Sequence, residues 1–228
     1  MDHVRRSQLA YGGSAERHLE LVGSALSEAI ETADDLALLR AVVDSARHLD
    51  GVAVDAGCGT GRVARLLADR GLTAVGIDVA PRMVAIAASE HPDVPFAVGR
   101  LDALPIAPGC CSVVVCWYSI ITTPPDGLGA IGGELRRALV EGGRALVAFQ
   151  SGGGERVERP RAYGTDVDLT LHRHDADVVA AALRAAGLRI DDVTVRPAER
   201  AHEHGPQGFV TATAPDRGRP VRRRPAVG

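Results

Sequence analysis

The chain contains no lysine and no asparagine, so all 26 of its basic residues are arginine. The absence of lysine excludes two large classes of site. A P-loop needs a lysine against its phosphates, and a pyridoxal-phosphate enzyme needs one to form a Schiff base. The bias toward arginine, alanine, glycine and valine is typical of a GC-rich coding genome.

Long apolar runs are also missing. No run reaches 18 residues, which argues against a membrane-spanning helix, and the N-terminus lacks the apolar segment of a signal peptide. We therefore expect a cytoplasmic protein. The net charge of -3 gives no overall attraction to nucleic acid.

The chain has few cysteines, and their spacing matches no paired-cysteine motif. The four residues form no C-x-x-C pair, and three of them cluster at one expected strand: Cys58, Cys110, Cys111 and Cys116. This spacing argues against a disulfide framework or a structural zinc site. We expect reduced, mostly buried thiols.

The most informative stretch that is present runs from Gly51 to Met83. Val52–Val54 form a short β-branched run that is typical of a buried parallel strand, and the run ends at Asp55. Glycines follow at alternate positions, where they allow positive φ and close approach of a ligand to the backbone: Gly57, Gly59 and Gly61.

A helix and a second strand follow this glycine turn. Gly71 is placed to end the helix, and Leu72–Ile77 predicts a strand with Asp78 at its carboxyl end. Ligands of open α/β sheets bind outside the carboxyl ends of the strands. Gly57 and Asp78 are 21 positions apart, close to the roughly 20 expected for an acid that binds a ribose. The stretch predicts a nucleotide site, for a dinucleotide or for S-adenosylmethionine.

Two residues distinguish between a dinucleotide and S-adenosylmethionine as the ligand. The dinucleotide fingerprint G-x-G-x-x-G needs a third glycine where this chain has Arg62. Asp55 lies two residues before the first glycine, where a carboxylate repels a pyrophosphate but not an ammonium group. V-D-A-G-C-G-T-G resembles motif I of the class I S-adenosylmethionine-dependent methyltransferases, and G-I-D-V-A-P-R-M resembles their second motif.

The resemblance implies an α/β fold of the Rossmann-like, doubly wound type. Its mostly parallel seven-stranded sheet has an antiparallel last strand and an N-terminal helical cap. It implies that Asp78 binds the ribose of S-adenosylmethionine and that Asp55 helps to hold the amino group. The other cofactor contacts expected on this basis are Tyr11, Ala56, Gly57, Cys58, Gly59, Gly61, Val79, Met83, Leu101, Asp102, Cys116 and Trp117.

The region that follows the third strand departs from the family pattern. Many members carry an acid four positions before an L-P pair, where it meets the adenine amino group, and this chain has Arg100 there. Asp102 is displaced by two residues, and whether it takes over this role stays open. Leu101 is expected to present its backbone N–H to the adenine.

The end of the fourth strand should border the acceptor. The stretch W-Y-S-I-I-T-T-P-P resembles a group of small bacterial methyltransferases that usually have histidine where Thr122 stands. If that histidine is a base or a substrate contact, its absence affects activity. Trp117 either stacks on a ligand or packs in the core. The D/N-P-P-Y motif of amino-methylating enzymes is absent, and Pro124 and Pro125 are expected to shape a turn.

The remaining chain predicts regular elements around this centre. Residues 1–10 are expected to be a loose start and 151–162 a mobile, glycine-rich loop. Helices are expected at 11–30, 34–48, 81–90, 128–140 and 176–186, with a turn at 141–143. Further strands are expected at 95–98, 110–116, 144–150, 167–171, 188–195 and 208–212. The organisation is a helical cap over 1–48, a methyltransferase domain over 49–214, and a disordered arginine-rich tail over 215–228.

No catalytic residue is identified by a motif. Tyr118, Tyr163 and His172 are candidates to remove a proton from a nucleophile. The pairs H-R-H and H-E-H are 28 residues apart and have no cysteine partners, so we expect no metal.

The preferred function is S-adenosylmethionine-dependent methyl transfer to an O or N nucleophile of a small-molecule acceptor. Three alternatives stay open. They are a non-catalytic, regulatory S-adenosylmethionine-binding protein, an NAD-dependent oxidoreductase, and methylation of RNA bound by the arginine tail. The oligomeric state is not predicted.

Overall fold

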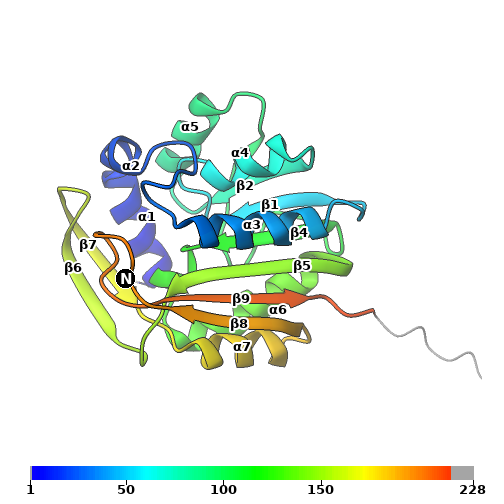
Figure 1. The fold of residues 1–228 in the computed structure, drawn as a ribbon. Helices are drawn as coiled ribbons and strands as arrows, with labels where there is room; N and C mark the ends of the chain where they lie inside the picture. The colour runs from blue at the N-terminus through cyan, green and yellow to red at the C-terminus, as the bar shows by residue number, and fades with distance from the viewer. Residues whose placement is uncertain (1, 217–228) are drawn as a thin grey trace, which may run out of the picture.

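The computed structural model describes residues 2–216, so nearly all of the predicted arginine-rich tail lies outside the described residues. Seven strands form one sheet in the order β3-β2-β1-β4-β5-β9-β8 (Figure 1). Their bounds are β1 Val52–Ala56, β2 Thr73–Asp78, β3 Phe96–Val98, β4 Cys111–Trp117, β5 Leu139–Gln150, β8 Arg189–Arg196 and β9 Gln207–Thr213. β9 is antiparallel to both its neighbours, whereas β1 to β5 are parallel. The predicted Rossmann-like, doubly wound sheet with an antiparallel last strand is confirmed.

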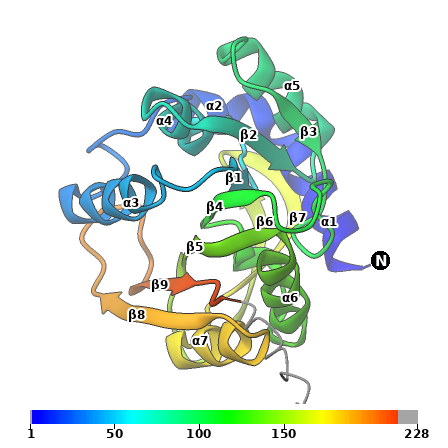
Figure 2. The ribbon, with the colours of Figure 1, turned by 90° about the vertical axis from the view of Figure 1, so that its right-hand side faces the viewer.

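Helices cover both faces of this sheet (Figure 2). Helices α3 and α4 lie over one face, and α6 and α7 lie over the other. Their bounds are α3 Ala33–Ser45, α4 Arg62–Asp69, α5 Pro81–Glu90, α6 Leu128–Ala138 and α7 Ala176–Ala185. Every residue of β4 is buried, as expected for a central strand with helices on both sides. α3 packs into the sheet core through Leu39 and Val43, so it belongs to the helical layer of the sheet.

The N-terminal segment differs from the expected single helix over 11–30. A first helix, α1, spans His3–Gly13, where a loose start was expected, because Asp2 caps it by accepting the Arg5 N–H at 2.7 Å. A second helix, α2, spans Ala15–Val22. The prediction was wrong because it considered only the spacing of apolar residues. Gly12 and Gly13 have low helix propensity, and the backbone of Ser14, which follows them, is not helical.

A β-hairpin occupies most of the segment expected to be a mobile loop. β6 (Arg156–Ala162) pairs antiparallel with β7 (Thr165–His172) in a separate two-stranded sheet. Glycine and charge made residues 151–162 look like a loop, but β7 supplies a pairing partner and α1 packs on β7. The expectation of a loop was therefore wrong for 156–162. In Figure 1 the hairpin stands beside α1 at one end of the main sheet.

Two boundaries near the fifth strand also differ. Helix α6 ends at Ala138 rather than at residue 140, and β5 begins at once with Leu139. The turn expected at 141–143 is an irregularity in the pairing of β5 with β4, at which Gly142 has φ +75°.

Two short 3-10 turns, η1 (Ile120–Thr122) and η2 (Pro125–Gly127), follow β4.

A buried ion network ties the sheet to the N-terminus of α3. Arg196, at the end of β8, donates to Asp35 at 2.8 Å and to Glu203 at 2.9 Å. Burial raises the pKa of Glu203, but hydrogen bonds from Arg196 and from backbone N–H groups outweigh it and hold this pKa at about 2. The network fixes the 197–206 loop beside the cavity described below. No helix within residues 2–216 combines the length and hydropathy that crossing a bilayer would need.

Candidate functional site

A cavity of about 710 Å³ lies beyond the carboxyl ends of the parallel strands. Its lining comes from the glycine turn after β1, the ends of β2 and β4, helices α1 and α2, η1 and the β6–β7 hairpin. This size falls within the range of about 300–1,000 Å³ that is common for small-molecule and cofactor sites. Its place is the one expected for a ligand of an open α/β sheet.

The glycine turn is held against the end of β2. The backbone N–H groups of Gly57 and Cys58 both donate to the carbonyl oxygen of Ile77, at 2.7 and 3.0 Å. Gly57 has φ +82°, and a Cβ on it would lie 2.1 Å from the Cβ of Ser119. A side chain is therefore excluded at position 57 by both conformation and space, and the backbone is left open to the cavity.

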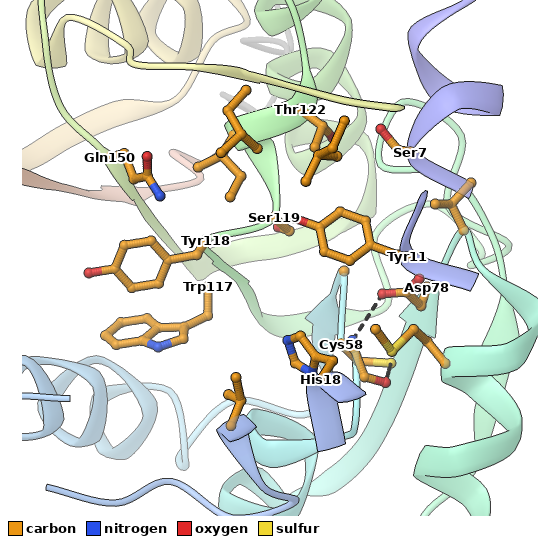
Figure 3. A pocket seen from close by; sticks show the side chains of 18 of the residues that line it. Ser7, Tyr11, His18, Cys58, Asp78, Trp117, Tyr118, Ser119, Thr122 and Gln150 are labelled. Carbon is orange, nitrogen blue, oxygen red and sulfur yellow. Dashed lines mark hydrogen bonds between the residues drawn. The ribbon is translucent and has the colours of Figure 1, made fainter. Parts of the chain in front are cut away.

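Asp78 joins the second strand to this turn. Its Oδ2 accepts the Gly59 N–H at 2.9 Å (Figure 3), and its Oδ1 accepts the Ala80 N–H at 2.9 Å. Burial raises the pKa of the Asp78 carboxyl above its ordinary value. Each carboxylate oxygen has further lone pairs, so Asp78 can accept two ligand hydroxyls without giving up its backbone partners.

Asp55 is buried at the start of the turn and also lines the cavity. Its Oδ2 accepts the N–H of Ala64 at 2.9 Å, in the first turn of α4. Burial raises the pKa of Asp55 to about 7, and the nearby Asp78 adds to the rise. Asp55 thus changes charge near neutral pH, so a positively charged ligand group in the cavity would favour its ionised form.

This raised pKa predicts a pH dependence of stability. Between the ordinary value of 3.8 and about 7, the folded state keeps a proton on Asp55 that the unfolded chain has released. The contribution is therefore complete below pH 3.8 and is lost as pH rises to about 7. Between pH 5 and 8 the wild type should lose about 2 kcal/mol of unfolding free energy relative to Asp55→Asn, whose side-chain oxygen still accepts from Ala64. Urea titrations at several pH values measure this difference, and parallel pH profiles for the two proteins would contradict it.

An aromatic cluster closes the cavity above the glycine turn. Tyr163, at the tip of the hairpin, lies with its ring centroid 4.7 Å from that of His18 and 6.5 Å from that of Tyr11. Burial raises the pKa values of both tyrosines and lowers that of His18 to about 4. The Nδ1 atom of His18 is buried without a hydrogen-bond partner. A neutral imidazole is thus available to a ligand, and its Nδ1 accepts or donates according to the tautomer.

The opposite end of the cavity is formed after β4. Figure 3 shows Tyr118 and Gln150 across the cavity from Tyr11 and Asp78, with Thr122 on the side of Ser7. Tyr118 has φ +58° and Tyr163 has φ +53°, and these are the two non-glycine residues with positive φ in the described part of the chain. Both line the cavity, in keeping with the tendency of strained backbone to occur at functional sites.

Trp117 packs in the core, and stacking on a ligand stays a prediction. Its ring packs 5.9 Å from Phe209 and 5.6 Å, edge-on, from Tyr118, and it is part of the core of the sheet. It also lines the cavity, and its indole Nε1 is buried without a hydrogen-bond partner.

The structure brings most of the predicted site residues together. Those that line the cavity are Tyr11, Asp55, Gly57, Cys58, Gly59, Asp78, Val79, Met83, Leu101, Asp102, Trp117, Tyr118 and Tyr163. Four others lie outside the lining set: Ala56, Gly61, Cys116 and His172. His172 is buried and stacks on His174 at 6.2 Å, so its side chain is not presented to the cavity as a base would be.

Arg100 and Asp102 neutralise each other at the cavity wall. The guanidinium of Arg100 donates to both carboxylate oxygens of Asp102, at 2.8 and 2.7 Å. The same hydrogen bonds lower the pKa of Asp102. Asp102 is therefore an ionised group that already has a partner, and Leu101 between them lines the cavity.

Several lining residues were not identified from the sequence. His18 is one, although it lies seven residues after Tyr11, a spacing of two helical turns that would have suggested a common face. Ser119 and Gln150 are others, at the ends of β4 and β5. The ion pair of Glu31 with Arg62, the residue at the position of the missing third glycine, is a third feature, and the two side chains are 3% and 14% exposed.

The histidine and carboxylate side chains of the described residues do not form a metal site. Within residues 2–216 no group of three or more His, Cys, Asp or Glu side chains is arranged to hold an ion. His202 and His204 line the cavity, whereas His174 contacts the carbonyl oxygen of Ile120 at 3.3 Å.

Residues 53–143 match the family model of a methyltransferase domain. Malonyl-[acyl-carrier protein] O-methyltransferase from Pectobacterium atrosepticum is 32% identical over 96 residues, which are 42% of this chain and 36% of that protein. The chain spans about a third to a half of the length of the curated relatives it matches.

Solved structures share the fold over nearly the whole chain. Magnesium protoporphyrin IX methyltransferase from Synechocystis, with bound S-adenosylmethionine, is similar with a TM-score of 0.67 at 16% identity, covering 93% of this chain and 97% of that one. The [4+2]-cyclase SpnF is similar with a TM-score of 0.70 at 20% identity, covering 93% and 96%. Residues 53–143 are therefore similar to a methyltransferase domain, and the chain has the Rossmann-like fold of these solved structures.

S-adenosylmethionine is the cofactor that the domain match supports, and it is the ligand bound in the Synechocystis structure. The cavity fits it. The glycine turn leaves its backbone open to the cavity, and the carboxylates of Asp78 and Asp55 are part of the same lining.

Proposed function

We propose that the protein transfers the methyl group of S-adenosylmethionine to an O or N nucleophile of a small-molecule acceptor. The observation that carries this proposal is the continuity of the cavity. One set of lining residues includes Asp78 and the glycine turn, and also Tyr118, Thr122 and Gln150 on the opposite side. A cofactor and an acceptor can therefore occupy the same enclosed space.

Bound S-adenosylmethionine supplies an electrophilic methyl group, and the protein contributes binding, orientation and exclusion of water. Asp78 and the turn at Gly57 to Gly59 hold the nucleoside side, and Asp55 holds the amino group. Tyr11, His18 and Tyr163 close the cavity above them. Orientation of two reactants in this way can lower a barrier by about 7–11 kcal/mol.

None of the three predicted bases can accept a proton from the acceptor, which favours an acceptor that reacts without a general base. The pKa values of Tyr118 and Tyr163 are raised by burial, so neither phenol accepts a proton near neutral pH. His172 is outside the cavity lining, and Thr122 has no basic group. Nucleophiles with a free lone pair at neutral pH, such as a carboxylate oxygen or an unprotonated amine, are therefore favoured over aliphatic alcohols.

A non-catalytic, S-adenosylmethionine-binding role is the second candidate, and it is favoured because none of the three predicted bases, Tyr118, Tyr163 and His172, presents a basic group to the cavity. The NAD alternative is disfavoured because Arg62, which pairs with Glu31, is the residue at the position of the third glycine. Methylation of RNA depended on the arginine tail, which lies outside the described residues.

The test is transfer of tritium from methyl-labelled S-adenosylmethionine to panels of carboxylates, amines and phenols, with Asp78→Asn as the negative control. Labelled product from one panel, absent with the variant, is the expected result. A protein that binds S-adenosylhomocysteine at micromolar concentration but labels no panel would favour the non-catalytic alternative.

A further inference from the structure

The β6–β7 hairpin forms one wall of the cavity from the cofactor end to the acceptor end. Its tip, at Tyr163, contacts His18 above the glycine turn. Further down the strands, Arg159 is paired across from Leu169, and both side chains line the cavity. Leu169 is 4% exposed, so this face of the hairpin is turned inward. Arg159 lies four residues before Tyr163, or about 13 Å along an extended strand.

One of the arginines that line the cavity has no carboxylate partner among the described residues. Four arginines line it in the described chain, and three have carboxylate partners: Arg62 with Glu31, Arg100 with Asp102, and Arg161 with Asp166. Arg159 is half-buried, and its guanidinium makes neither an ion pair nor a side-chain hydrogen bond within residues 2–216.

The lining carboxylates are already engaged elsewhere. Asp35 and Glu203 share Arg196, whereas Asp55 and Asp78 accept backbone N–H groups near the glycine turn. An arginine stays charged at every physiological pH, and a partly desolvated charge without a partner costs free energy. Such a cation facing a cavity is suited to an anionic ligand, and its planar fork matches the geometry of a carboxylate or a phosphate.

The part of the cavity lining formed by β7 and the neighbouring η1 belongs to a hydrophobic cluster of the core. Leu169 and Leu171 of β7 lie on the same hairpin as Arg159, and Ile121 and Ile131 contribute to the same lining. Thr122 and Thr123 add two buried hydroxyl-bearing side chains. An occupant of this end must therefore combine an apolar body with a charged group.

We propose that Arg159 binds a carboxylate or phosphate group of an amphipathic acceptor whose apolar part packs against Leu169, Leu171 and Ile121. This inference rests on the proposed function and names the class of its acceptor. The anionic group serves as an anchor and is distinct from the methylated atom, because Arg159 lies far down the hairpin from the residues over the glycine turn.

The experiment is calorimetric titration of the protein, saturated with S-adenosylhomocysteine, with octanoate, octyl phosphate and octanamide. The three probes share a chain length and differ in the head group. On the wild type, octanoate or octyl phosphate should bind at least about ten-fold more tightly than the neutral amide. The stronger of the two identifies the anion.

Two variants isolate the role of Arg159. Arg159→Gln should reduce the preference for the anion to less than about two-fold. Arg156→Gln is the matched control, because Arg156 lies in the same strand, pairs with the exposed Glu158 and is outside the cavity lining. It should keep the full preference. Equal unfolding midpoints of the two variants exclude a folding defect.

Three outcomes would overturn the inference: equal affinities for charged and neutral probes, a preference that survives Arg159→Gln, or no binding of any probe. The protein is first titrated with S-adenosylhomocysteine alone. This titration distinguishes failure of the anion site from failure of the proposed function. If that titration is silent, the proposed function fails. The probes are then tested on the protein alone, where an Arg159-dependent preference still supports the anion site.

Discussion

Replacing Asp78 by asparagine is expected to weaken binding of S-adenosylhomocysteine by at least about 100-fold. The two oxygens of the carboxylate accept the N–H groups of Gly59 and Ala80, each at 2.9 Å, and in our account they also accept the ribose hydroxyls. An asparagine keeps the volume but turns one acceptor into a donor. One backbone N–H and one ribose hydroxyl would then each face an amide N–H.

Calorimetric titration measures this loss, with Asp93→Asn as the matched control. Asp93 is an exposed aspartate that pairs with Arg65 at the surface, so its variant should bind as the wild type does. Asp78→Asn should also lose about 1–3 kcal/mol of unfolding free energy, because a buried donor loses its acceptor. An unchanged affinity in a folded Asp78→Asn protein would remove Asp78 from the cofactor site.

Gly57→Ala should lower the free energy of unfolding by more than about 3 kcal/mol and abolish measurable cofactor binding. Two costs combine at this position. The backbone has φ +82°, and the new Cβ would lie 2.1 Å from the Cβ of Ser119. Neither atom is at the end of a flexible side chain, so the turn or the segment after β4 must move.

Gly71→Ala separates the two costs. Gly71 has φ +77°, but a Cβ there meets nothing within 4 Å, so its variant bears the backbone strain alone, about 1–2 kcal/mol. It should keep cofactor binding, because Gly71 is outside the cavity lining. Equal losses of stability in the two variants would show that the contact with Ser119 is unimportant.

The centre of the fold was predictable because its signals are local. A β-branched strand, alternating glycines and an acid at the end of the next strand are contiguous in sequence, and they occupy β1, the glycine turn and β2 as expected. The order and direction of the outer strands came instead from the resemblance, since pairing between β5 and β9 joins segments far apart in the chain.

The errors fall where distant contacts outweigh local pattern. Residues 156–162 look like a loop until β7 supplies a partner strand. His172 was predicted as a candidate base, but α1 packs on β7, and His172 is buried outside the cavity lining. The lack of a carboxylate partner for Arg159 also could not be predicted from local sequence, because it depends on which carboxylates the other arginines contact in the folded chain.

The central claim is that the cavity around Asp78 and the glycine turn binds S-adenosylmethionine. Its most direct test is parallel calorimetric titration of the wild type with S-adenosylhomocysteine, S-adenosylmethionine and NAD. We expect micromolar binding of both adenosyl ligands, with one site per chain, and no heat from NAD. Binding of NAD in their place, or silence from all three ligands, would contradict it.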